Sequence, residues 1–153
     1  MQKPFVTQAE LFVSSRDLEH PALHALDDTE AVLDWSKIEP ILSSIYASKT
    51  GRPSYPLLTL FRGLLLGVWY RLSDVELSQF LYRDLLFRKF CHLELGGDVP
   101  EASTLGRFRN QLVEHDLWER LLGEINRQLE AKNIILTEGR INIIDATPVE
   151  AAQ

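Results

Sequence analysis

The sequence predicts a mainly α-helical protein: a helical bundle with a helix-turn-helix-like region, followed by a C-terminal strand. Apolar residues recur every three or four positions over most of residues 1–133, which is typical of amphipathic helices. Helix-start signals stand at Asp34 and at Ser73-Asp-Val-Glu76, the latter in the form of a capping box. After Asn133 the pattern changes to β-branched apolar residues, which are typical of a strand.

The first third of the chain predicts two helices and a break. Residues from His20 to Leu33 predict a short amphipathic helix, and Asp34 is expected to cap a second helix that runs through Ile45. Residues 49–56, KTGRPSYP, are rich in turn formers and end in a proline suited to the first turn of a helix.

The middle of the chain predicts the core. Residues 57–72 are apolar nearly all round, which is expected of a buried helix. Ser73 should open a helix through Val75, Leu77, Phe80 and Leu81, and a short helix follows within DLLFRKFCHL. The glycines and the proline of LGGDVPEA predict a loop.

The last third predicts two more helices and the change to extended structure. Ser103 is expected to cap a helix over 104–115, and a long helix is expected to stop at Asn133. ILTEGRINIIDATPV then predicts an extended segment, a turn at Glu138-Gly139 and a strand from Arg140. The expected organisation is a helical domain over 1–133 and the first strand or hairpin of a further unit over 134–153.

Composition sets broad limits on the protein. Its 153 residues, 45% apolar and 25% charged, suit one globular domain with a real core. The start of the chain has no apolar signal region, and the most apolar stretch, 57–68, is too short to span a bilayer and contains Arg62. We therefore expect a cytoplasmic protein with no membrane partner. The single cysteine, Cys91, is expected to be a buried thiol.

The net charge of −6 is unevenly distributed. Residues 1–50 carry 4 Lys/Arg and 8 Asp/Glu (−4), residues 51–110 carry 8 and 6 (+2), and residues 111–153 carry 4 and 8 (−4). Seven of the eight cations in the middle third are arginines, whose planar guanidinium suits bidentate contact with phosphate and guanine. A segment charge of +2 is also common in proteins that do not bind DNA, so composition leaves a nucleic-acid partner open.

The helix from Thr104 to His115 is the best candidate for contacting DNA bases. Leu105, Phe108 and Leu112 share one face and should point to the core. The opposite face presents polar residues, with Gln111 beside it and Arg109 on its flank: Ser103, Arg107, Asn110 and Glu114. Arg, Asn and Gln make bidentate contacts to base edges, and a capped helix, a loop and an Arg-bearing helix resemble a helix-turn-helix in outline. The alternative is an ordinary solvated helix face.

Other basic residues are weaker candidates. Arg83, Arg88 and Lys89 could contact phosphates, although solvated charges on a short helix explain them equally well. Arg52, between Gly51 and Pro53, could belong to an arm that enters a minor groove, although an interhelical turn explains it too.

The histidines and the strand end at Asp145 are further candidate chemical sites. His20 and His24 have an i, i+4 spacing but no third ligand nearby, so a zinc site is not expected. Asp145 follows Ile141, Ile143 and Ile144, which make the predicted strand apolar on both faces, and it would be held rigidly at the strand end. Metal-assisted phosphoryl transfer needs several carboxylates, and Glu150 would point to the opposite face of a continuing strand. From the residues alone, Asp145 is either a catalytic carboxylate or a turn residue.

Four stretches, taken in order, resemble the N-terminal part of a bacterial insertion-sequence transposase of the insertion-sequence-5 type, in the DDE class. They are GRPSYPLLTLFRGLLLGVWYRLSDVELSQFL (51–81), FRKFCHL (87–93), VPEASTLGRFRNQL (99–112) and GRINIIDATPVEA (139–151). The resemblance implies a bacterial, nucleoid-associated protein. It also implies that residues 1–133 form a helical DNA-binding domain and that residues 134–153 form the first strand or hairpin of a truncated, ribonuclease-H-like α/β catalytic domain.

The resemblance also assigns chemistry. It implies that Asp145 is the first of three catalytic carboxylates, which together would bind two divalent ions, normally Mg²⁺, in a complete catalytic domain. This chain has no residues to match the family's second Asp and its Glu, so we expect an enzyme-family protein that is inactive alone and binds no metal by itself.

The expected function is DNA binding in transposition. Double-stranded DNA at the terminal inverted repeats is the expected partner, with a homo-oligomer or a full-length transposase as a further one. The alternatives are a stand-alone DNA-binding or transposase-inhibiting module and a non-functional remnant.

Overall fold

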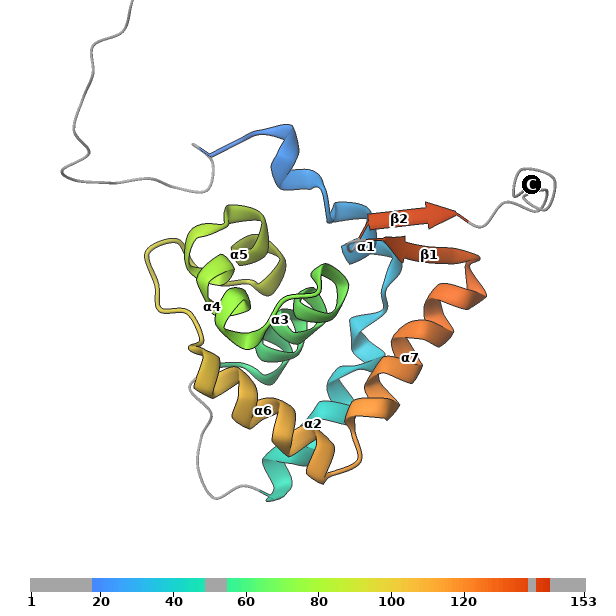
Figure 1. Ribbon diagram of the computed structural model, residues 1–153. Helices are drawn as coiled ribbons and strands as arrows, with labels where there is room; N and C mark the ends of the chain where they lie inside the picture. The colour runs from blue at the N-terminus through green and yellow to red at the C-terminus, as the bar shows by residue number, and fades with distance from the viewer. Residues whose placement is uncertain (1–17, 49–54, 138–139, 144–153) are drawn as a thin grey trace, which may run out of the picture.

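The computed structural model describes residues 18–48, 55–137 and 140–143, and within them the mainly helical prediction is confirmed (Figure 1). The elements in chain order are a 3-10 turn Pro21–His24, α1 Asp27–Val32, a 3-10 turn Trp35–Lys37, α2 Glu39–Ser48, α3 Leu57–Tyr70, α4 Asp74–Arg83, α5 Leu85–Cys91, α6 Ala102–Glu114, α7 Trp118–Ala131, β1 Ile134–Thr137 and β2 Arg140–Ile143.

Helix α3 is the central element, as its continuous apolar sequence predicts. Residues Leu57 to Leu66 are buried with one exception, the half-buried Leu58. Helices α2, α4, α5 and α6 all pack against α3, which lies at the centre of Figure 1. A helix that is apolar on all sides is stable in water only when other elements cover every side of it. The central position of α3 therefore follows from its composition.

A buried cation lies within this apolar helix. Arg62 is 4% exposed, and its guanidinium forms a two-nitrogen ion pair with the Glu30 carboxylate of α1, with Nη2 at 3.0 Å from Oε2. Arg62 Nη1 also donates to the Phe90 carbonyl at 3.0 Å, and the guanidinium carbon lies 3.8 Å from the centre of the Trp35 ring. This cluster joins α1, α3 and α5 around one charge.

Local capping fixes the start of α4 as predicted. Ser73 Oγ accepts from Glu76 N and the Glu76 carboxylate accepts from Ser73 N, which forms the capping box. The Asp34 carboxylate accepts from Ser36 N, but it caps the 3-10 turn that precedes α2 rather than α2 itself. Asp84 caps α5 by accepting from Phe87 N at 3.1 Å.

One sequence prediction about α6 is wrong in detail, and one apolar residue of α4 is exposed. Ser103 is not an N-cap: α6 begins at Ala102, two residues earlier than predicted, after Glu101, whose carbonyl accepts from Leu105 N at 3.0 Å. Val75 is 57% exposed, because the buried face of α4 is set by Leu77 and Leu81. A helix-start signal therefore locates the start of a helix only to within a few residues, and an apolar side chain in a helix need not be buried.

The predicted helix over His20–Leu33 is divided. Residues 21–24 form a 3-10 turn capped by His20 Nδ1, which accepts from Ala22 N at 3.0 Å. Only Asp27–Val32 forms an α-helix. The division places both Leu26 and Leu33, on either side of α1, in the core at 2% and 4% exposure.

Helix α7 closes the bundle against the segment around Asp34. Gln128 is 5% exposed; its side-chain oxygen accepts from Asp34 N at 2.7 Å and its side-chain nitrogen donates to Asp34 O at 3.3 Å. The helix ends before Asn133, which has a positive φ of 55°, in agreement with the predicted stop. None of the helices in the described part of the chain combines the length and apolar character needed to cross a membrane.

The C-terminal extended segment forms an antiparallel hairpin, with Ile134 opposite Ile143 and Thr137 opposite Arg140. Strand β1 packs against α7, β2 packs against α1, and Ile134 joins the core at 8% exposure. The hairpin that the sequence predicts is therefore present and contacts the helices. The predicted buried thiol is also present, with Cys91 fully buried and its pKa raised by burial.

Candidate nucleic-acid interface

Helix α6 separates its apolar and polar residues by face. Leu105, Phe108 and Leu112 are buried to 0–2% exposure and anchor the helix on the core. Ser103, Arg107 and Asn110 are exposed on the opposite side, together with Glu114, as the helical spacing predicts. Gln111 is half-buried beside this face. The buried residues fix which side of α6 can meet a partner.

Arg107 is the most accessible cation of this face. Its Nη2 makes one long contact of 3.5 Å with Thr104 Oγ1 in the same helix. Over residues 18–48, 55–137 and 140–143, no carboxylate forms an ion pair with it. The guanidinium therefore keeps its donors for a ligand.

Arg109, by contrast, is engaged within the fold. Its Nη1 and Nη2 lie 2.7 Å and 2.5 Å from the two carboxylate oxygens of Asp74, the first residue of α4. Gly106, one turn earlier, faces the same carboxylate: a Cβ there would lie 3.5 Å from Asp74 Oδ2. The hydrogen bonds from Arg109 lower the pKa of Asp74, and those same bonds raise the pKa of Arg109. Arg109 thus fastens α6 to α4, and its charge is already neutralised.

Replacing Arg109 with methionine is expected to reduce the free energy of unfolding by about 1 kcal/mol at neutral pH, because the pair is only partly exposed and bidentate. The folded pKa of Asp74 lies below its unfolded value, so this stabilisation is complete above the unfolded pKa of about 3.9 and is lost as pH falls through the folded pKa. Urea unfolding of both proteins from neutral pH into acid should show the difference shrinking. Arg120→Met, at an exposed arginine of α7, is the control. A difference independent of pH would contradict the assignment.

Much of the basic excess of residues 51–110 is used inside the fold. Arg62 and Arg88 are buried, while Lys89 and Arg109 are paired with carboxylates. Arg52 lies outside the described residues, so its predicted role in a minor groove is not addressed by the structure. Three exposed arginines of this stretch have no carboxylate partner among the residues described: Arg71, Arg83 and Arg107.

The burial of Arg88 argues against its predicted contact with a phosphate. It is 6% exposed, and its guanidinium donates to the Tyr82 carbonyl at 3.1 and 2.8 Å and to the Glu94 carbonyl at 2.7 Å. A phosphate cannot reach a guanidinium buried in this way. Lys89 is half-exposed, but it donates to Asp27 Oδ1 at 3.1 Å and to the Leu23 carbonyl at 2.8 Å, which fastens α5 to the N-terminal elements.

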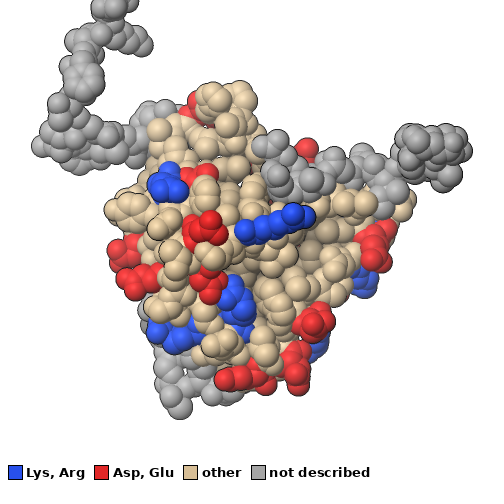
Figure 2. All heavy atoms as spheres, viewed as in Figure 1, with Lys and Arg blue, Asp and Glu red and all other residues tan. Residues whose placement is uncertain are grey.

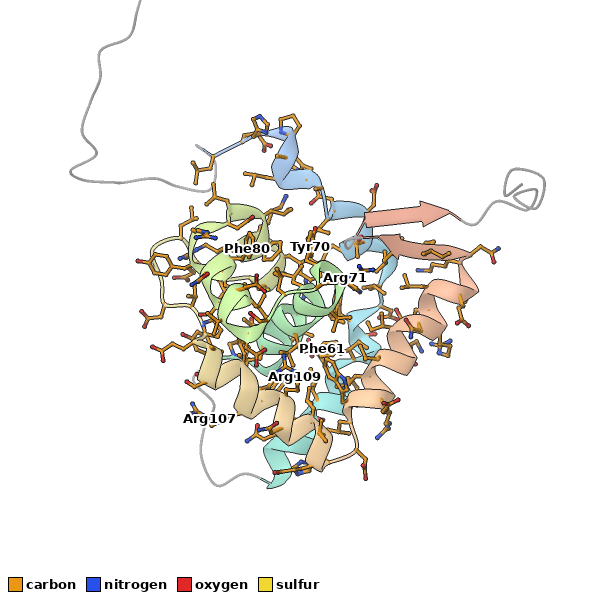
Figure 3. All side chains as sticks on the ribbon, in the orientation of Figure 1. Phe61, Tyr70, Arg71, Phe80, Arg107 and Arg109 are labelled. Atoms are coloured by element: carbon orange, nitrogen blue, oxygen red, sulfur yellow. The ribbon has the colours of Figure 1, made fainter. Side chains whose placement is uncertain are left out.

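The surface around α6 is mixed in charge. Figure 2 shows Lys and Arg interspersed with Asp and Glu on the face that carries α4 and α6. Such a surface does not attract nucleic acid through one strong positive field, so any contact would depend on individual side chains. Figure 3 labels Arg107 and Arg109 on α6 and Arg71 at the end of α3.

The helices next to α6 are arranged around α3. Helices α3, α4 and α6 pack against one another, and α5 with the residues that follow it connects α4 to α6. The connection is longer than the turn of a simple helix-turn-helix, as the sequence predicts, and it contains a helix of its own.

Comparison with known protein families identifies the family of this chain. Residues 14–111, which include α1 to α5 and most of α6, match the transposase domain family DUF772. The chain belongs to that transposase domain family. The match includes Arg107, Arg109 and Asn110. No solved structure matches the chain.

The metal chemistry that the resemblance implies is not represented in the described part of this transposase domain. Asp145, the expected catalytic and metal-binding carboxylate, lies outside the described residues. Within the described ranges no three His, Cys, Asp or Glu side chains form a group that could hold a metal ion.

The predicted contacts of the transposase domain do not include Arg71. This residue follows α3 directly, is exposed, and has a positive φ of 57°. The available sequence signal is its position between the end of an apolar helix and the Ser73 capping box, where glycine is the usual residue.

Proposed function

We propose that this transposase domain binds duplex DNA through the exposed face of α6, at the terminal inverted repeats of a mobile element of the insertion-sequence-5 type. The observation that carries the proposal is the presence of Arg107 and Asn110 on the exposed side of a helix whose other side is fixed by buried residues. Arg contacts guanine and Asn contacts adenine with two hydrogen bonds each. Membership of a transposase domain family supports DNA as the partner.

Within this proposal the residues of α6 have different roles. Arg107, Asn110 and the half-buried Gln111 contact base edges, and Ser103 contacts the phosphate backbone near the start of the helix. Arg109 acts through Asp74, by setting the orientation of α6, and does not itself contact DNA. Cleavage belongs to a complete DDE catalytic domain, in which Asp145 and two further carboxylates would bind Mg²⁺.

Selection from a pool of random-sequence duplexes is the first test, because the repeat sequence is unknown. The wild-type protein should enrich a defined site, and binding to the enriched duplex can be followed by fluorescence anisotropy. Arg107→Ala and Asn110→Ala should each weaken binding by about 1–3 kcal/mol and relax selectivity at particular positions of the site.

Arg120→Ala is the matched control for this test, because Arg120 is an exposed arginine on α7. Its binding should equal that of the wild type, and circular dichroism should show that all three variants are folded. If no site is enriched, or if the α6 variants bind as the wild type does, the proposed function is wrong.

A further inference from the structure

In the described part of the chain, four helices (α3, α5, α6 and α7) are followed by a residue with positive φ, a conformation for which glycine is the usual residue, and the first three share one hydrogen-bond pattern. Arg71, His92 and Asp116 follow α3, α5 and α6 with φ values of 57°, 59° and 55°. In each case the next residue donates to the carbonyl five positions back, as in Leu72 N to Gly67 O at 2.8 Å and Leu93 N to Arg88 O at 2.9 Å. Side chains in this left-handed conformation carry a conformational cost that glycine avoids. The backbone of each turn would therefore form with glycine, and the side chains of Arg71, His92 and Asp116 are not required for the turn.

The backbone of Arg71 is fixed from both sides. The hydrogen bond from Leu72 N ends α3, and the capping box of Ser73 and Glu76 begins α4 two residues after Arg71. Its side chain is exposed, and within the described part of the chain no carboxylate pairs with it. A cation is thus presented to solvent from a rigid turn.

This turn is fastened to α6. Asp74, three residues after Arg71, holds Arg109 of α6 through both carboxylate oxygens and faces Gly106. The Asp74 charge is therefore neutralised by Arg109, and the Glu76 carboxylate is used by Ser73 N. Figure 3 shows Arg71 at the end of α3 and Arg107 on α6, with Arg109 between them in this view.

We propose that Arg71 is a phosphate contact that fixes the register of α6 on duplex DNA. The inference rests on the proposed function and adds to it a residue outside the helix that contacts the bases. Phosphate contacts orient a protein on the duplex, whereas base contacts supply sequence preference. The arginine fork suits a phosphate, and a contact from a rigid turn loses little conformational freedom on binding.

Replacing Arg71 with glycine tests this inference, because the fold and the interface should respond in opposite directions. The melting temperature should stay unchanged or rise, since glycine adopts a φ of 57° without strain. Affinity for the enriched duplex and for an unselected duplex of equal length should fall by a similar factor, about tenfold, with no change in sequence preference. The slope of log affinity against log salt concentration should decrease in magnitude by about 1.

His92→Gly is the matched control. His92 has the same helix-end conformation and hydrogen bonding on α5, so it should show the same change in melting temperature. Its DNA affinity and salt dependence should equal those of the wild type. Arg71→Lys, which keeps the charge, should retain most of the affinity that Arg71→Gly loses.

The outcomes separate this inference from the proposed function. If Arg107→Ala weakens binding while Arg71→Gly leaves affinity and salt slope unchanged, the register contact is wrong and the α6 interface stands. An equal loss of affinity in His92→Gly would also overturn the inference, because relief of helix-end strain would then be sufficient. If the wild type enriches no duplex, the proposed function itself fails.

Discussion

Replacing Arg62 with alanine is expected to lower the free energy of unfolding by about 4 kcal/mol, among the largest losses expected of a single substitution here. The change removes the ion pair with Glu30, the hydrogen bond to the Phe90 carbonyl and the contact with the Trp35 ring. It also leaves a cavity beside α3, where the buried Arg62 side chain was. Urea unfolding should show a lower midpoint with an unchanged slope, since the same surface is exposed.

A second variant separates the charge from the packing. Arg62→Met combined with Glu30→Gln removes both charges while retaining most of the volume, and it should recover a large part of the loss. Asp28→Ala is the control: Asp28 is an exposed acid on the same short helix as Glu30, and its removal should cost only about 0.5 kcal/mol. A loss below about 1 kcal/mol in Arg62→Ala would show that the cluster does not stabilise the fold.

Leu65→Ala is expected to cost about 3 kcal/mol, because it leaves a cavity at the centre of the bundle. Leu65 is fully buried in α3, the helix against which four others pack. Val68→Ala, on the same helix at 48% exposure, should cost less than about 0.5 kcal/mol. Equal losses in urea unfolding would contradict the central position of α3.

The sequence predicted the elements whose signals are local. The apolar run of α3, the capping box at Ser73 and the hairpin after Asn133 each depend on neighbouring residues, and all three are present. The exposed face of α6 followed from spacing alone, since its buried and exposed residues alternate with the helical period.

The sequence could not predict the roles of individual charges. Arginine is usually a solvated residue. The Arg88 guanidinium is instead buried, and it donates hydrogen bonds to the carbonyls of Tyr82 and Glu94, each six residues away. The Asp74–Arg109 pair joins residues 35 positions apart, a contact that no periodic pattern contains. The roles of these charges are set by tertiary packing, whereas helix spacing sets only which face they occupy.

The bond between Gln128 and Asp34 bears on the order in which this protein acquires its fold during synthesis. These residues are 94 positions apart, so closing the loop between them carries an entropic cost that shorter contacts within α3 to α6 avoid. The inner helices can associate as soon as they emerge, because their mutual contacts are nearer in sequence. Val32 and Asp34 are made early, but they gain their hydrogen bonds to Lys132 and Gln128 only after α7 has been made. These two early residues are then among the last of the described residues to be fixed in place.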